Sequence, residues 1–366
     1  MTARIVVGTA LAGAVVLLVV VVASTILGRP PAADAAGAAA KAGGKRTPRP
    51  ITIAWAGDTT LGSTHGLPPD RGRPLLAGVK DLLHQADLTV LNYEGTLATS
   101  GTSKCGLEPA EQCFAFRAPP ENATTLRRAG VDLVNLANNH ANDYGPVALD
   151  ETAAALTAAK VGATGRPGQI HLTTVEGIRI ASVGFSTYPW TNDLRDLAGA
   201  QSLIRAAADA ADVVLVLVHA GAEGVGQEHT PDADEVFLGE PRGNVRAFAH
   251  AAVDAGADLV LGSGPHVLRG LERYGDRLIA YSLGNLAGYH TFSSRGTMAL
   301  SGVLQITVDP DGAYRRGRFT SLVLDGVGVP RADPAGAAAL LVSDVGRQDF
   351  GDAAVTVGSD GTLASG

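Results

Sequence analysis

The sequence lacks a basic stripe, and its 29 basic residues are outnumbered by 36 acidic ones. The formal net charge of −7 argues against a nucleic-acid partner, because neutralising a phosphate backbone needs clustered Lys and Arg. Hydrophobic residues, in contrast, make up 46% of the 366 positions. That content is enough for one large α/β domain or two small ones without stabilising crosslinks.

The amino terminus carries an uninterrupted run of apolar, Gly, Ser and Thr residues from 5 to 27, preceded by Arg4. About 20 apolar residues span a bilayer, whereas a cleavable signal core has about 7 to 15. We therefore predict a signal anchor over residues 1–28, followed by a flexible Ala-, Gly- and Pro-rich linker over 29–50. The expected location is the cell membrane, single-pass with an extracytoplasmic domain. The Ala-Asp-Ala run at 33–35 leaves cleavage and secretion open.

Cysteine is scarce, since Cys105 and Cys113 are the two in the sequence. An extracytoplasmic location would allow them to oxidise, so we predict a disulfide between them. A metal-binding pair is the weaker alternative, because no second Cys or His pair lies nearby at zinc-like spacing.

From residue 51 onward, short β-branched runs alternate with helical patterns, which is typical of an α/β fold. We predict an α/β sandwich of two mixed β-sheets flanked by helices over residues 51–328, and a peripheral, frayed tail over 329–366. The expected helices cover residues 75–85, 121–129, 146–160, 194–210 and 244–255. The expected strands cover residues 51–56, 88–91, 131–136, 213–218 and 259–261, with hairpins at 172–175/178–183, 267–274/277–282 and 303–308 with the strand after Gly312.

Each of these strands ends in a polar group, and ligand sites in open α/β sheets lie at the carboxyl ends of strands. Taken singly, each group has an ordinary alternative: Asp58 as a turn or N-cap residue, Glu94 as an exposed loop residue, His219 as a satisfied core histidine. Together they form a mixed oxygen and nitrogen ligand set suited to one or two divalent cations, Mn, Zn or Fe. The predicted metal ligands are Asp58, Glu94, Asn139, His140, His219 and His266.

At these residues the chain resembles the capsule-synthesis CapA family, also called poly-gamma-glutamate biosynthesis proteins, over about residues 51–324. The motifs that carry the resemblance are Gly57-Asp58 with Leu61-Gly62, Asn92-Tyr93-Glu94, 114–119, 136–140 with Asp143-Tyr144-Gly145, His219 with Gly221 and Glu223, and 265–267 with 281–285.

The resemblance implies a calcineurin-like metallophosphatase fold and an extracytoplasmic, membrane-tethered protein that helps to make or export an anionic polymer. It also implies catalytic roles for His140, Glu94 and His219. The expected supporting residues, which would contact substrate, are Asn138, Glu223, Ser282 and Asn285.

Two positions depart from the family pattern. Gly264-Pro265-His266 stands where His-Pro-His is usual, which removes a potential ligand, and His219-Ala220-Gly221 replaces His-Trp-Gly. The leading hypothesis is a membrane-anchored, metal-dependent hydrolase-like protein of envelope polymer biosynthesis that takes an anionic polymer or a phosphate-containing substrate. The alternatives are a non-enzymatic assembly or export subunit of a polymer synthase, alongside its other subunits, and a generic metallophosphoesterase.

Overall fold

The computed structural model describes residues 48–64, 66–106 and 113–365. These residues belong to one compact unit that begins at Arg46. The predicted signal anchor and most of the predicted linker lie outside the described residues. Within the described part of the chain, no helix is long and apolar enough to cross a membrane.

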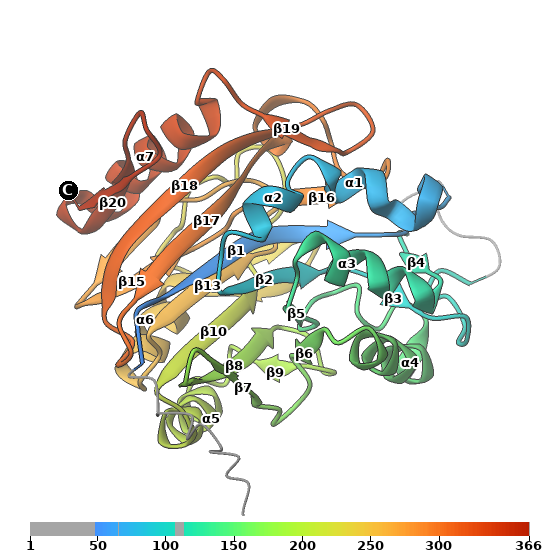
Figure 1. Cartoon of the computed structure of the whole chain (residues 1–366), viewed down its shortest axis with the longest axis horizontal. Helices are drawn as coiled ribbons and strands as arrows, with labels where there is room; N and C mark the ends of the chain where they lie inside the picture. Colours follow the sequence, from blue (N-terminus) through green and yellow to red (C-terminus); the bar gives the residue numbers. More distant parts are fainter. Residues whose placement is uncertain (1–47, 65, 107–112, 366) are drawn as a thin grey trace, which may run out of the picture. The chain divides into compact units, whose positions relative to one another are not determined.

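Two mixed β-sheets dominate the fold, as predicted (Figure 1). In the first sheet β1 runs parallel to β2 and antiparallel to β17, while β16 pairs with the carboxyl end of β1. The strands of this sheet, in spatial order, are β19 (Pro330–Ala332), β18 (Tyr314–Leu324), β17 (Leu300–Val308), β1 (Ile51–Thr60), β2 (Leu88–Tyr93), β5 (Leu133–Asn135) and β6 (Gly162–Thr164), with β16 (Asn285–Gly288) beside β1.

The second sheet has a parallel centre, in which β8, β10, β13 and β15 follow one another, and antiparallel edges. Two small sheets, β3 (Thr96–Leu97) with β4 (Arg117–Ala118) and β11 (Glu235–Phe237) with β12 (Glu240–Gly243), lie apart from it. The strands of the second sheet, in spatial order, are β21 (Leu363–Ser365), β20 (Ala354–Val357), β14 (Leu271–Tyr274), β15 (Arg277–Ala280), β13 (Leu259–Ser263), β10 (Val213–His219), β8 (Ile178–Ser186) and β7 (His171–Val175), with β9 (Asn192–Asp193) beside β8.

The long apolar strands bury both of their faces. Along β10, Leu215 and Leu217 pack into the core between the sheets, whereas Val214 and Val216 pack under helices. This alternation follows from the two-residue period of a strand, and it explains why β10 is an unbroken hydrophobic run. The helices are α1 (Arg73–Ala77), α2 (Lys80–Leu83), α3 (Ala123–Ala129), α4 (Gly145–Ala158), α5 (Leu197–Ala210), α6 (Val245–Asp254) and α7 (Ala337–Phe350), with 3₁₀ turns at Pro69–Gly72, Pro120–Asn122, Gly296–Ala299 and Gly351–Ala353.

Two predictions about secondary structure are wrong. The single helix expected over residues 75–85 is instead the two short helices α1 and α2, which separate at Gly78, where glycine disfavours a continuous helix. The C-terminal residues are not a frayed tail: α7 buries Ala338 and Val342 in the core between the sheets, and β20 extends the second sheet. Their Ala- and Gly-rich composition concealed an apolar helix face that closes one end of the core.

The predicted disulfide is confirmed, since Cys105 and Cys113 are bonded. The hairpin predicted at Glu176-Gly177 is also present, because β7 and β8 pair antiparallel around that turn. Glu176 and Gly177 both have positive φ, 49° and 87°, as a tight turn between twisted strands requires.

Candidate metal centre at the strand ends

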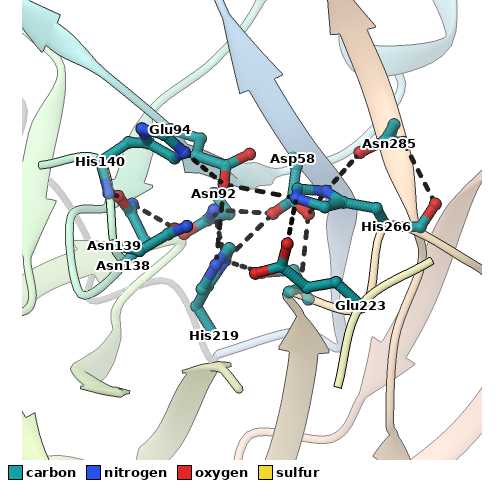
Figure 2. Close-up of polar contacts among 12 residues, drawn as sticks. Asp58, Asn92, Glu94, Asn138, Asn139, His140, His219, Glu223, His266 and Asn285 are labelled. Atoms are coloured by element: carbon teal, nitrogen blue, oxygen red, sulfur yellow. Dashed lines mark hydrogen bonds and ion pairs between the residues drawn. The ribbon is translucent and has the colours of Figure 1, made fainter. Parts of the chain in front are cut away.

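The strands of both sheets deliver polar side chains to one place. Asp58 lies near the end of β1 and pairs in register with Asn92 of β2 and Asn285 of β16. Gly57 permits this close packing, because a Cβ there would lie 2.0 Å from the carbonyl oxygen of Gly284. From the second sheet, β10 ends in His219, and the loop after β13 carries His266 (Figure 2).

Three histidines face a single carboxylate oxygen, Glu94 Oε1. The Nε2 atoms of His219 and His266 each lie 3.7 Å from it, and Nε2 of His140 lies 3.9 Å away. Glu94 is fully buried, and neither of its oxygens accepts a hydrogen bond from any described residue. A buried carboxylate normally has hydrogen-bond partners, so this arrangement leaves an unmet demand for positive charge.

Asp58 differs from Glu94, because both of its carboxylate oxygens accept hydrogen bonds. Its Oδ1 accepts a hydrogen bond from Asn92 Nδ2 at 2.7 Å, and its Oδ2 lies 3.1 Å from His266 Nδ1. The backbone N–H of Gly264 also donates to Oδ2, at 3.3 Å. Burial alone would raise the pKa of Asp58, but His219 and His266 outweigh it and hold that pKa below its ordinary value.

The pKa values of Glu94 and His266 are raised above their ordinary values, whereas that of Asp58 is lowered. Burial raises the pKa of Glu94 well above its ordinary value; His266 opposes this shift, and Asp58 adds to it. For His266, burial lowers the pKa, but the carboxylates of Glu94, Asp58 and Glu223 outweigh it and raise the pKa to about 10. The metal-free site therefore holds a proton on His266 at neutral pH, where a cation would supply the same positive charge.

These residues fit a divalent cation. Ligand atoms of Asp58, Glu94 and His266 all lie within 4.8 Å of one another. Nε2 of His219, which faces the same Glu94 oxygen, is buried and has no hydrogen-bond partner among the described residues. Imidazole nitrogen together with carboxylate oxygen is the donor set of Zn, Mn or Fe rather than of Ca or Mg.

His140 approaches the centre from the first sheet, and two contacts hold its ring. Its Nδ1 lies 2.8 Å from Asp143 Oδ2, and its ring stacks on Phe116 with centroids 4.1 Å apart. Lys104, the residue before the disulfide-bonded Cys105, lies 2.6 Å from the other oxygen of Asp143. Burial lowers the pKa of His140, while Asp143 opposes that shift, so His140 presents a neutral Nε2 to the site at pH 7.

Of the remaining predicted site residues, three form internal hydrogen bonds. The Asn138 amide donates to Tyr93 O and accepts from His140 N, and the Ser282 hydroxyl donates to Val267 O and accepts from Gly284 N. Asn285 binds His266 twice, through its ring Nδ1 at 2.8 Å and its carbonyl oxygen at 3.1 Å. These three residues shape the site rather than face outward.

Glu223 and Asn139 differ from those three. Glu223 is partly exposed, lies 3.7 Å from His266 Nε2 and accepts a hydrogen bond from Arg242. Asn139 lies beside His140 (Figure 2), and its Oδ1 is buried without a hydrogen-bond partner among the described residues. Both therefore retain atoms that could contact a ligand.

Four residues that the structure brings to the site are not among the predicted site residues, although Asn92 and Asp143 stand in the motifs that carry the family resemblance: Asn92, Lys104, Asp143 and Arg242. Two of them carried a usable signal. Asn92 lies in β2, two residues before Glu94, and Asp143 follows His140 by three residues within one turn, a spacing that permits a carboxylate to contact an imidazole. Lys104 comes from a loop and Arg242 from the small strand β12, and no local sequence pattern connects either residue to the site.

The family departure at Gly264 leaves no gap. Gly264 has a φ of 116°, and a Cβ there would lie 2.7 Å from the backbone nitrogen of Ala220. The chain leaving β10 therefore fills the space that a side chain would need. Ala220, the second departure, is itself buried and packs in the core under α5 and α6.

An α/β sandwich of two mixed sheets, with carboxylates and imidazoles gathered at strand ends from both, defines an α/β protein with a candidate metal centre. The chain belongs to the bacterial capsule synthesis protein family, whose sequence model matches residues 52–289. Family membership thus agrees with the resemblance found in the sequence.

Individual relatives are similar over part of their length. The capsule biosynthesis protein CapA of Bacillus anthracis is 29% identical over 227 residues, 57% of this chain and 52% of that protein. The PGA biosynthesis protein CapA of Bacillus subtilis strain 168 is 26% identical over 224 residues, 57% and 54% of the two chains. A probable polyglutamine synthesis accessory protein of Mycobacterium tuberculosis is 27% identical over 245 residues, 57% and 59%. The chain spans about half the length of the curated relatives it matches.

Solved structures with a similar fold include phosphoesterases. A 5'-nucleotidase precursor from Thermus thermophilus aligns with a TM-score of 0.44 and 16% identity, over 80% of this chain and 58% of that one. The calcineurin-like phosphoesterase YfkN from Bacillus subtilis aligns with a TM-score of 0.42 and 12% identity, over 82% and 97%. These likenesses concern the fold and say nothing of activity.

Proposed function

We propose that this chain is a metal-dependent, hydrolase-like protein of capsule or related envelope polymer biosynthesis, acting on an anionic polymer or a phosphate-containing substrate. One observation carries the metal-dependent part: three imidazole Nε2 atoms face a fully buried Glu94 oxygen that accepts no hydrogen bond from the described residues. Family membership supports a role in polymer biosynthesis, since two relatives are named for capsule and PGA biosynthesis.

The chemistry follows from the donor set. A divalent cation, when bound, polarises a substrate oxygen and lowers the pKa of water. Glu94 faces all three histidines, so its carboxylate would help to hold the cation. The residues that would hold one or two ions are Asp58, Glu94, His219 and His266, with Asn139 as a further oxygen donor.

His140 is suited to proton transfer. Asp143 holds its Nδ1, and Phe116 fixes the plane of its ring, so its Nε2 faces the centre in one orientation. Because burial lowers its pKa, His140 can accept a proton at Nε2 near neutral pH and return it to a leaving group. Asp143 then stabilises the charged imidazolium.

We further propose that the domain is extracytoplasmic and tethered to the cell membrane, where other subunits of a polymer synthase are its partners. The apolar run at 5–27 and the Cys105–Cys113 disulfide support this location. Protease added to intact protoplasts should then digest the domain. Protection of the domain until the membrane is lysed would contradict the proposal.

Metal binding and turnover can be tested together on the purified full chain. After loading with Mn or Zn and desalting, we expect retained metal by elemental analysis and hydrolysis of bis(p-nitrophenyl) phosphate. Glu94→Gln should lose both, because the amide cannot neutralise a cation, whereas Glu121→Gln, at an exposed position, is the matched control. Loaded wild-type protein that retained no metal would refute the metal centre.

A non-enzymatic accessory subunit is the second candidate function. The filled space at Gly264 favours it, because a ligand position usual in the family cannot be rebuilt there. Polymer levels in the producing cell distinguish the two candidate functions. His140→Ala should abolish polymer production if the site turns over substrate. A variant that folds, localises and still supports normal polymer levels would favour the accessory role.

A further inference from the structure

A groove lies next to the His140 side of the metal centre. Its volume is about 400 Å³, and its lining includes Ser63, Leu67, Thr99, Arg117 and Tyr144. Arg117 directly follows Phe116, which stacks on His140, and Tyr144 directly follows Asp143, which holds the same histidine. The groove therefore begins one residue beyond the contacts that position His140.

Chain geometry explains this adjacency. Successive residues of an extended chain point to opposite sides, so Phe116 faces His140 while Arg117 faces the groove. Gly62 permits the approach of the loop after β1, because a Cβ there would lie 2.1 Å from the carbonyl oxygen of Arg117. Thr99, which also lines the groove, is fixed as well, since Glu151 accepts hydrogen bonds from both its backbone N–H and its hydroxyl.

Arg117 is held in place without its charge being neutralised. Its guanidinium lies over the Tyr144 ring, 4.1 Å from the centroid, and it forms no ion pair with an acidic side chain among the described residues. By contrast, Arg242 and Arg269 are paired with Glu223 and Glu235. Stacking occupies the face of the guanidinium and leaves its in-plane N–H groups available.

No acidic residue lines this groove in the described part of the chain. A preoriented guanidinium in a wall without carboxylates suits two-point binding of another carboxylate or a phosphate. We propose that the groove binds an anionic group of the substrate, next to the bond that reacts, and that Arg117 selects it. This inference rests on the proposed function, and it names the part of the substrate that the metal centre does not contact.

The test uses the full-length chain in low salt and calorimetric titration with three tetrapeptides. Tetraglutamate supplies carboxylates, tetra(phosphoserine) supplies phosphates, and tetraglutamine is the neutral control. We expect Arg117→Gln to weaken the anionic peptides about tenfold, the usual scale for a lost charge-assisted contact, and Arg117→Lys to recover part of the loss. The matched control is Arg128→Gln, on the exposed face of α3, which should bind as the wild type does.

The outcomes separate the two proposals. Wild-type protein that retains no metal defeats the proposed function, whereas binding of metal with equal affinity of wild type and Arg117→Gln for both anionic peptides defeats the groove. Failure of both anionic peptides to bind the wild type also defeats the groove. Weakening of one peptide alone identifies the carboxylate or the phosphate as the recognised group. In hydrolysis of a substrate that carries that group, Arg117→Gln should raise KM and leave kcat unchanged, which a folding defect would not do.

Discussion

His140 and His266 lie on opposite sides of Glu94 (Figure 2); His140 is buried, the His266 side chain is 13% exposed, and each Nδ1 is held by a side-chain oxygen. Their pKa values nevertheless move in opposite directions: burial lowers the pKa of His140, while for His266 three carboxylates outweigh burial and raise the pKa to about 10. Proximity to carboxylates, rather than depth, separates the two.

The difference suggests a division of labour. The His266 side holds excess negative charge and keeps a proton in the metal-free protein, so a cation would replace that proton there. On the His140 side, Lys104 already compensates the charge of Asp143 through a 2.6 Å ion pair. That side has no need of a cation, and its histidine remains free to transfer protons.

Alanine substitution of His140 and of His266 tests this comparison most directly. His266→Ala should reduce metal affinity by on the order of 100-fold or more, because a ligand and its charge balance are both lost. His140→Ala should keep the metal but reduce kcat by about 10²- to 10⁴-fold, the range for a lost acid–base group. Elemental analysis and steady-state kinetics measure the two effects. Equal loss of metal in both variants would show that His140 is a ligand and would end the division.

The pH dependence of metal binding sharpens the same comparison. Since the pKa of His266 is raised to about 10, its imidazole carries a proton in the metal-free protein that a cation must displace. Apparent affinity should therefore rise with pH between about 6 and 8, by about tenfold per unit for each proton released. His140→Ala should leave this slope unchanged, whereas His266→Ala should lower it. A flat profile in the wild type would mean that His266 binds no cation.

Much of the fold follows from local patterns, and particular residues show why. The unbroken run of β10 and the Glu176-Gly177 turn are fixed by neighbours in sequence, and both were predicted. The role of α7 was not, because a weakly apolar face becomes significant only when the edges of two sheets meet it.

The site shows the same limit. Strand-end position led to Asp58, Glu94 and His266, whose ligand atoms the structure places together. Lys104 and Arg242 could not be found in this way. Lys104 pairs with Asp143, 39 residues later in the sequence, and Arg242 pairs with Glu223, 19 residues earlier. The backbone of Ala220 occupies the space that a side chain at position 264 would need. This follows from how the backbone packs, which residue types alone do not predict.

Asp143 offers the finest test, because it changes how His140 is held without removing it. Asp143→Asn would lose the Lys104 ion pair and weaken the bond to Nδ1, so the imidazole would adopt more than one orientation. We expect kcat to fall about tenfold or somewhat more, with metal content unchanged, as for other partners that orient a histidine. Asp81→Asn, at an exposed position of α2, is the matched control. Loss of metal in Asp143→Asn would instead show that the Asp143 carboxylate contributes to metal binding. The His140 and His266 sides would then not have separate roles.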